Sequence, residues 1–377
     1  MNSKQPVPIP SFPTWRTAGG DAQRSGRARC RLVSSPAAPR SIQVNAPSKS
    51  SVLFASSGTA YLADARGGVH AFNAERRPAW KARLSAGTVT TPALASDDSR
   101  LYVGTLQGHA CALDASSGDL LWETEIQTTS DPRILSAILP LDDSILVSSW
   151  GGRWTRLSSG DGSVMASWDA GIYPQSAAAA SADGNIYILR AVWEKGIELV
   201  RLSQDGSEHV LHVEEAGSRG PRRMMTAASP VVDASNDLLF AVLNHDTDSV
   251  LAVQDLKGGS AIRTSSLPAC VQATPTLGPN GSLRIADLAG NLHALGPEGQ
   301  IEWTYRTGSE YLLASPVVDA NGTAWLGDPL GQIHEIDANG WGYIHHTTAR
   351  SIEAQPSVSP TGELVIATSD GNILFFG

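Results

Sequence analysis

The sequence contains few of the residues from which disulfide frameworks and membrane anchors are made. Its three cysteines are an odd number with no C-x-x-C pair, so we expect reduced thiols and no disulfide framework. No apolar stretch approaches the length of a membrane span. The proline-rich residues 1–13 also lack the apolar core of a secretory signal. These absences predict a soluble, cytoplasmic protein without a membrane span.

Catalytic, helical and nucleic-acid-binding signatures are missing as well. The patterns G-x-S-x-G and H-E-x-x-H, the P-loop and the dinucleotide fingerprint do not occur. No window shows a sustained 3.6-residue apolar period, which predicts few helices. No basic stretch is interleaved with aromatic residues, so we expect no nucleic-acid partner.

What the sequence does contain is a repeat. A Thr-Pro or Ser-Pro pair is followed by a β-like run, a glycine turn, a second β-run and often a tryptophan. The repeat prolines and tryptophans both recur at multiples of about 40–46 residues, which is the period of propeller blades. They are Pro92, Pro230, Pro275, Pro316 and Pro356, with Trp80, Trp122, Trp168 and Trp303. Extrapolation places three further unit starts near Ser50, Ser136 and Ser176, which gives eight units.

This repeat predicts an all-β fold, a single eight-bladed β-propeller of four-stranded blades. The eighth unit ends at residues 373–377 without room for an outer strand. Residues 40–44 precede the first unit and are suited to supply that strand, which would remove an open sheet edge. We therefore expect the N-terminal segment to close the last blade. The predicted organisation is a flexible Pro-rich tail over residues 1–14 and the propeller over residues 15–377.

The repeat resembles one known family, the PQQ-like (quinoprotein-type) eight-bladed β-propellers. The resemblance rests on Leu101-Tyr-Val-Gly104-Thr-Leu-Gln-Gly108, then Ala112-Leu-Asp114, Gly118 and Trp122, and on the opening motif Trp15-Arg-Thr-Ala-Gly-Gly-Asp-Ala-Gln-Arg-Ser-Gly26. It covers roughly residues 15–377 and implies the fold. The family includes quinone-dependent dehydrogenases, outer-membrane assembly scaffolds and sensor domains, so it does not fix a function.

The resemblance also allows a cofactor prediction. The dehydrogenases of this family typically place adjacent cysteines near the quinone, together with a carboxylate, an amide and an aspartate that bind Ca²⁺. This sequence has no adjacent cysteines. We therefore expect no PQQ, no other cofactor and no metal.

Charge is distributed unevenly along the chain. Residues 1–50 carry eight basic side chains and one acidic one, although the formal net charge of the chain is −9. One interpretation is that this basic segment lies across an acidic ring of the propeller. The alternative is a docking arm for nucleic acid or an acidic partner.

Several conspicuous residues are placed by the repeat and are expected to be scaffold. His70, His293 and His334 occupy one register position, where the second unit has Cys111, and we expect packing between blades instead of a metal triad. The four repeat tryptophans are expected to anchor the outer strands, since a buried tryptophan removes roughly 150–250 Å² from water.

Departures from the repeat are the candidate functional residues. Turns between the second and third strands share one face of the disc with the links between blades. Asp64, Asp287 and Asp328 replace the Thr105 and Ser149 of other units in these turns. They are either Asx-type turns or an acidic funnel for a cation or a cationic ligand.

Further departures concentrate in units three to five. Aromatic, histidine and charged side chains on one rim would suit a small-molecule or peptide pocket at the channel mouth. His245 and Asp246 would form an acid–base pair only in a loop, because adjacent strand residues point to opposite faces. The candidates are Trp150, Arg153, Trp193, Arg222, Arg223, His245 and Asp246, with Tyr311 near a comparable link.

Two hypotheses of function follow. The first is a binding or scaffold propeller that presents one loop face and the channel mouth to a protein, peptide or small ligand, without PQQ redox chemistry. The second is a non-redox enzyme of a small-molecule biosynthetic pathway, such as an isomerase, lyase, cyclase or hydrolase. A deep pocket with a converging acid–base pair would favour the enzyme, and a broad, shallow apolar patch the scaffold.

Overall fold

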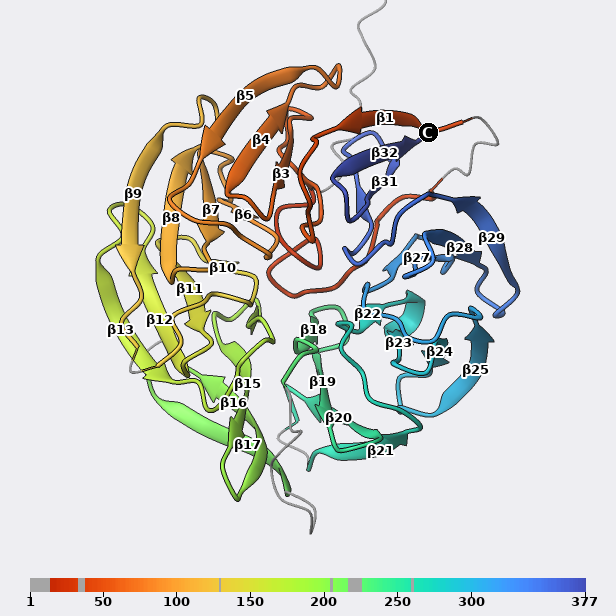
Figure 1. The fold of residues 1–377 in the computed structure, drawn as a ribbon. Coiled ribbons are helices and arrows are strands. Elements are labelled where there is room, and N and C mark those ends of the chain that lie inside the picture. Colours follow the sequence, from red (N-terminus) through yellow and green to blue (C-terminus); the bar gives the residue numbers. More distant parts are fainter. Residues whose placement is uncertain (1–13, 33–37, 129, 204–205, 216–225, 259–260) are drawn as a thin grey trace, which may run out of the picture.

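The computed structural model describes residues 14–32, 38–128, 130–203, 206–215, 226–258 and 261–377. Eight four-stranded antiparallel sheets surround a central axis, as Figure 1 shows. The all-β, eight-bladed prediction is therefore confirmed. Within these ranges the one helical element is a 3₁₀ turn, η1 (Pro279–Gly281), and no helix in them is long and apolar enough to cross a membrane.

The first four blades follow one another along the chain, each running from the channel outward. Blade 1 contains β2 (Leu53–Phe54), β3 (Ala60–Ala63), β4 (Gly68–Phe72) and β5 (Pro78–Arg83). Blade 2 contains β6 (Ala93–Leu94), β7 (Arg100–Gly104), β8 (His109–Asp114) and β9 (Leu120–Glu125). Blade 3 contains β10 (Leu139–Pro140), β11 (Ser144–Ser149), β12 (Arg153–Ser158) and β13 (Val164–Asp169). Blade 4 contains β14 (Ala179–Ala180), β15 (Ile186–Val192), β16 (Gly196–Leu202) and β17 (Glu208–Glu215).

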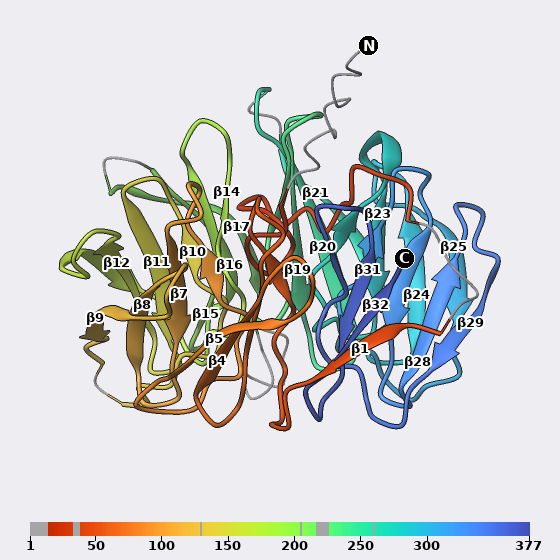
Figure 2. The same cartoon turned by 90° about the horizontal axis from the view of Figure 1, so that it is seen from above.

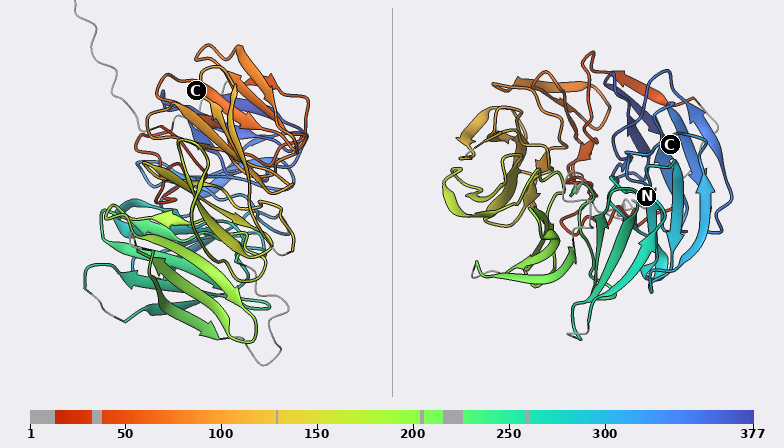
Figure 3. Two further views of the ribbon diagram at one scale, coloured as in Figure 1. Left: turned by 90° about the vertical axis from the view of Figure 1, so that its left-hand side faces the viewer. Right: turned by 60° about the horizontal axis from the view of Figure 1, so that its bottom comes forward.

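The remaining blades complete the ring, which Figure 3 shows from the side and tilted. Blade 5 contains β18 (Val231–Asp233), β19 (Leu238–Asn244), β20 (Ser249–Asp255) and β21 (Arg263–Leu267). Blade 6 contains β22 (Thr276–Leu277), β23 (Leu283–Ala286), β24 (Asn291–Leu295) and β25 (Ile301–Arg306). Blade 7 contains β26 (Val317–Val318), β27 (Ala324–Gly327), β28 (Gln332–Ile336) and β29 (Gly342–Thr347). Blade 8 contains β30 (Ser357–Val358), β31 (Leu364–Ala367), β32 (Asn372–Phe376) and β1 (Arg40–Gln43).

The N-terminal strand closes the ring as predicted. β1 is the outer strand of blade 8 and pairs antiparallel with β32, from Arg40 opposite Phe375 to Gln43 opposite Asn372. Figure 2 shows this strand lying along the outside of the disc. The strand covers an edge of β32 that would otherwise be open to pairing with another chain.

The antiparallel order gives the disc two distinct faces. We call one the link face, because it carries the turns between second and third strands, such as residues 64–67, and the links between blades, such as residues 84–92. We call the other the hairpin face. It carries the turns between first and second strands and between third and fourth strands, such as residues 55–59 and 73–77.

The repeat tryptophans join each blade to the next. The Trp80 indole Nε1 of blade 1 donates a hydrogen bond to the Ala115 carbonyl of blade 2 at 3.0 Å, and Trp122, Trp168 and Trp303 do the same one blade further on. The contact requires a glycine at position 118, because a Cβ there would lie 2.5 Å from the Trp80 ring. The predicted anchoring role is thus confirmed.

The Ser/Thr-Pro pairs have a second inter-blade role around the channel. In blades 1, 4, 5 and 6 the residue two positions before the inner strand donates its N–H to the hydroxyl at the same position of the following blade. Ser229 N–H donates to Thr274 Oγ1 at 3.2 Å, and Thr274 N–H donates to Ser315 Oγ at 2.8 Å. Ala137, Ala177 and Gln355 carry no hydroxyl at this position, so the belt is interrupted at blades 3, 4 and 8.

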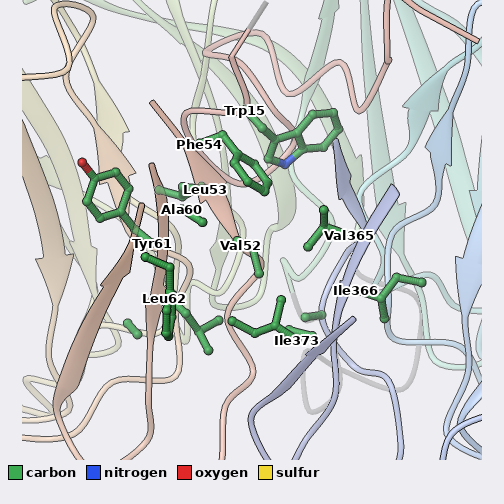
Figure 4. Packing of buried hydrophobic residues seen from close by; sticks show 14 of the residues in the cluster. Trp15, Val52, Leu53, Phe54, Ala60, Tyr61, Leu62, Val365, Ile366 and Ile373 are labelled. Carbon is green, nitrogen blue, oxygen red and sulfur yellow. The ribbon is translucent and has the colours of Figure 1, made fainter. Parts of the chain in front are cut away.

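The opening motif lies inside the channel, where the red chain crosses the middle of Figure 1. We call residues 15–26 the channel segment. Its carbonyls accept hydrogen bonds from inner-strand N–H groups in the order of the blades. The six pairs are Phe54 to Trp15, Leu94 to Arg16, Ala180 to Ala22, Val232 to Gln23, Leu277 to Ser25 and Val318 to Gly26, at 2.7–3.2 Å. Trp15 also packs beside Phe54 and Val365, as Figure 4 shows, and so joins blade 1 to blade 8.

Arg24 fixes the fold of the channel segment from within. Its side chain is 1% exposed and donates to the carbonyls of Ala18, Ile138 and Ala178, and to the hydroxyl of Thr17, at 2.7–3.1 Å. Burial lowers the pKa of its guanidinium to about 10, so it stays charged at neutral pH. Of the basic residues near the N-terminus, Arg16 and Arg24 lie in the channel segment, whereas Arg40 lies on the outer strand β1. Arg16 pairs with Asp98 at 3.0 Å.

Candidate functional site

The three repeat-breaking aspartates lie in link-face turns but do not face a funnel. Asp64, Asp287 and Asp328 are at most 2% exposed. One oxygen of each accepts hydrogen bonds from backbone N–H groups two and four residues further on, which is the Asx-type arrangement. The other oxygen contacts a histidine Nε2 of the same blade, at 2.7, 2.9 and 3.2 Å.

The histidine partners of these aspartates are the three that share a register position. His70, His293 and His334 lie on the third strand of their blades and reach back to the turn. Burial by itself would raise the pKa of the three aspartates, but the hydrogen bonds from histidine and backbone outweigh it, and each pKa is lowered. The three pairs are on three separate blades and act as internal braces.

Blades 3 and 4 place a group of side chains on the link face, all of them exposed except the half-buried Trp150. We define the rim patch as Arg133, Trp150, Arg153, Tyr173 and Trp193. The Trp150 and Tyr173 rings are 5.2 Å apart, and the Arg133 guanidinium lies 5.7 Å from the Trp150 ring. Tyr173 and Trp193 are 54% and 58% exposed, a large apolar area for a surface.

Backbone contacts between the two blades hold the rim patch together. Trp150 N–H donates to the Arg133 carbonyl at 2.7 Å, which joins the β11–β12 turn to the preceding link. The link after β13 forms a parallel bridge between Gly171 and Ala191, which brings Tyr173 to the strand that ends in the Trp193 turn. The patch is thus carried by fixed backbone, although its side chains are open to solvent.

A groove runs beside the rim patch. It has a volume of about 580 Å³ and is lined by Thr128, Gly152, Arg153, Val164 and Asp169, among others. Arg153 is exposed and makes no ion pair with a described residue. Its free guanidinium and the aromatic rings are the features that distinguish this part of the link face from the regular blades.

His245 of blade 5 pairs with Glu214, not with the adjacent Asp246 that the sequence suggested. His245 Nε2 lies 3.0 Å from Glu214 Oε1, and His212 Nε2 lies 3.2 Å from the other oxygen of Glu214. Asp246 is exposed, and the aspartate nearest to His245 is Asp248, with 3.9 Å between Nδ1 and Oδ1. This cluster joins the end of β17 to the β19–β20 turn and is 20–32% exposed.

The other predicted residues lie apart from these groups. Tyr311 is exposed in the link between β25 and β26, on the far side of the link face from the rim patch. Arg222 and Arg223 lie outside the described residues. Sequence reasoning missed Arg133 and Tyr173, because they lie in links between blades, which have no repeat position. It also missed His212 and Glu214, which lie on the outer strand β17 and contact His245 only in the folded chain.

The channel mouth on the link face does not fit a quinone cofactor. The cavity there is about 140 Å³, and Ala18, Gly19 and Arg24 of the channel segment form its floor. Cofactor pockets usually measure roughly 300–1,000 Å³. The three cysteines are all unpaired, and Cys111 is buried within blade 2 away from this mouth. The residues at the mouth are serines, threonines and the Lys49–Glu353 ion pair, with 2.8 Å between Nζ and Oε2.

The repeat-built scaffold, the closing strand and the loop-borne side chains define a propeller of the PQQ-like class. A family model described as outer membrane protein assembly factor BamB matches residues 22–175 and 65–269, which together span about two thirds of the chain. The chain belongs to this family. No curated protein matches it.

Solved structures share the fold over nearly the whole chain. BamB from Moraxella catarrhalis is 17% identical, with a TM-score of 0.70 over 92% of this chain and 97% of that one. Quinohemoprotein alcohol dehydrogenase from Comamonas testosteroni is 12% identical, with a TM-score of 0.80 over 97% of this chain and 80% of that one. Saccharomyces cerevisiae Sqt1 is 10% identical, with a TM-score of 0.71 over 89% of this chain and 97% of that one. At these identities the likeness concerns the fold alone.

Proposed function

We propose that the protein is a binding scaffold that holds a segment of a partner protein on the link face of blades 3 and 4. The observation that carries the proposal is the rim patch, where Trp150, Tyr173 and Trp193 expose aromatic surface beside Arg133 and Arg153. Tryptophan, tyrosine and arginine are the residues in which the binding energy of protein interfaces concentrates. The proposed ligand is a partner segment with an apolar anchor for the rings and a carboxylate for Arg153.

Two further observations support a scaffold. The matching family model is described as an outer membrane protein assembly factor, and one similar solved structure is a BamB protein. The groove beside Arg153 is lined by residues from blade 3 and from the link that precedes it. A segment lying in it would contact the Arg153 guanidinium, at the edge of the rim patch. The cytoplasmic location stays a prediction.

The test compares two faces of the same protein. Wild-type protein and a Trp150→Ala/Trp193→Ala variant serve as bait, and retained partners are quantified. The matched control is Trp341→Ala, because Trp341 is 81% exposed and lies on the hairpin face. Loss of the same partner in the double variant, with full retention in the control, supports the proposal. Equal retention by all three proteins would contradict it.

The second candidate function is a non-redox enzyme, and one cluster favours it. His245 and His212 share the Glu214 carboxylate, an arrangement in which a carboxylate orients an imidazole for proton transfer. His245→Ala would then abolish turnover of a substrate and leave partner retention unchanged. Loss of partner retention in His245→Ala, with no change in any reaction, would instead assign the cluster to the scaffold.

A further inference from the structure

The hydrogen bonds between the channel segment and the inner strands follow a rule with two exceptions. The second residue of each inner strand directs its N–H to the channel, and in six blades that N–H donates to a carbonyl of the channel segment. In blade 3 the position is Pro140, which has no N–H. There Thr17 and Arg24 bind the Ile138 carbonyl instead. Blade 8 is the second exception.

In blade 8 the N–H is present and has no partner among the described residues. Val358 lies opposite Leu364 as Phe54 lies opposite Ala60, and the next residues form the same bond, Ala55 N–H to Thr59 and Ser359 N–H to Glu363. Because N–H groups alternate in direction along an antiparallel strand, the Val358 N–H points to the channel as the Phe54 N–H does. No described residue accepts a hydrogen bond from it. Leaving a buried N–H unpaired is costly in free energy, so such groups usually have a ligand or water.

The missing bond has a geometric cause. The channel segment starts at blade 1 and leaves the channel at blade 7, so its two ends flank blade 8 and leave a gap there. The gap is a pocket of about 110 Å³, which we call the blade 8 pocket. Thr14 and Trp15 line it from the first end of the segment, residues 27–30 line it from the second, and Val358 lines it from blade 8.

The wall of the blade 8 pocket is rich in unused donors. Arg27 and Arg29 both line it, and neither forms an ion pair with a described residue. Trp15 is 3% exposed, and its Nε1 has no hydrogen-bond partner in the described part of the chain. The one carboxylate in the wall, Asp21, already accepts hydrogen bonds from the Ser25 N–H and Oγ at 2.9 and 2.6 Å. Donors therefore exceed free acceptors in this pocket.

We propose that the blade 8 pocket binds a carboxylate, which accepts the Val358 N–H and is balanced in charge by Arg27 and Arg29. Two guanidinium groups favour an anion over a neutral carbonyl, because hydrogen bonds to a charged acceptor are about twice as strong. The pocket is small, and Asp21 shares its wall, which disfavours a dianionic phosphate. The site lies on the hairpin face, away from the rim patch, and is independent of the proposed scaffold function.

The proposal is tested with the full chain and acetate, at constant ionic strength maintained with chloride. Acetate raises the melting temperature of the wild type saturably, and acetamide does not. Arg27→Gln/Arg29→Gln weakens acetate binding on the order of tenfold or more. The matched control, Arg31→Gln, keeps wild-type binding, because Arg31 is exposed and does not line the pocket.

A backbone variant tests the N–H itself. Val358→Pro removes the donor without changing the strand, and blade 3 shows that the fold accepts proline at this position, as Pro140. The variant folds and loses acetate binding. Equal responses to acetate and acetamide, or unchanged binding in both the double arginine variant and Val358→Pro, would overturn the proposal.

A second pair of probes distinguishes two sources of the carboxylate, a peptide C-terminus and a small carboxylic acid. A tripeptide with a free C-terminal carboxylate is compared with the same tripeptide carrying a C-terminal amide. Stronger binding of the free acid than of acetate identifies a peptide terminus as the ligand, and binding of acetate alone identifies a small carboxylic acid. Failure of both acids to bind would refute the site and would leave the rim patch proposal untouched.

Discussion

The two faces of the disc differ in the contacts that build them: backbone hydrogen bonds dominate on the hairpin face, and repeat-breaking side chains on the link face. On the hairpin face, the channel segment crosses the central opening and is bonded to six blades. On the link face, the opening leads only to that segment, and the turns range from buried aspartates to exposed tryptophans. The difference teaches that backbone contacts between distant parts of the chain stabilise one face. Side chains that depart from the repeat distinguish the other.

Removing the N-terminal segment should have the largest effect on this contrast. Deletion of residues 1–45 removes both the channel segment and β1, so blade 8 loses its outer strand and six inner-strand N–H groups lose their acceptors. We expect aggregation, measured by size-exclusion chromatography with light scattering. Deletion of residues 1–13 is the control, because it keeps both elements. A monomeric 1–45 deletion with unchanged melting would disprove the closure account.

Arg24→Met should have the next largest effect. The substitution keeps much of the side-chain volume but removes the Arg24 donors from the carbonyls of Ala18, Ile138 and Ala178 inside the channel, and only Ile138 keeps another donor, Thr17. We expect the free energy of unfolding to fall by about 3–5 kcal/mol in urea titrations. Arg27→Met, just after the channel segment, is the matched control, and a similar loss in both variants would show that Arg24 has no special role.

Two link-face substitutions compare a buried aspartate–histidine pair with an exposed side chain of the rim patch. Asp328→Ala leaves the Leu330 and Gln332 N–H groups and buried His334 without an acceptor, and we expect a loss of about 2–4 kcal/mol. Trp193→Ala should change stability by no more than about 0.5 kcal/mol, since its side chain is largely exposed. Urea titration measures both, and comparable losses would remove the distinction.

The smallest effect is a dependence on acid. The pKa values of Asp64, Asp287 and Asp328 are lower in the folded protein than the unfolded value of about 3.9. Their contribution is therefore present above about pH 3.9 and is lost as the pH falls through the lowered folded pKa. Urea titrations across this range should show a shallower loss of stability for the triple Asp→Asn variant. An identical slope in the two proteins would be evidence against the braces.

Most of the fold could be predicted from the sequence, because each blade is marked by recurring side chains such as the repeat prolines and tryptophans. The spacing of Pro275, Pro316 and Pro356 gives the blade count, and the short last unit indicates the closing strand. The channel segment was not predictable in this way, because carbonyl groups accept its hydrogen bonds and every residue carries a carbonyl. Only the Gly19-Gly20 pair and Arg24 hint at it: a Cβ on Gly19 would lie 2.7 Å from the Arg24 Cα.

The candidate site was predictable only in part, for a related reason. Trp150, Arg153 and Trp193 stood out because they interrupt regular turns. Their partners Arg133 and Tyr173 come from links between blades, whose lengths vary and which have no repeat position. The aspartate–histidine pairs were each visible as residues, but the bond within one blade depends on a strand that reverses after the turn and returns the histidine to the aspartate.

Amide hydrogen exchange by NMR tests the central claim most directly, that the channel segment is a built-in part of the ring and leaves blade 8 open. The inner-strand N–H groups of Phe54, Leu94, Ala180, Val232, Leu277 and Val318 should exchange only through global unfolding. The Val358 N–H should exchange much faster in the absence of a carboxylate and should slow when acetate is added. Val358 protection equal to that of the six others, with or without acetate, would contradict the account.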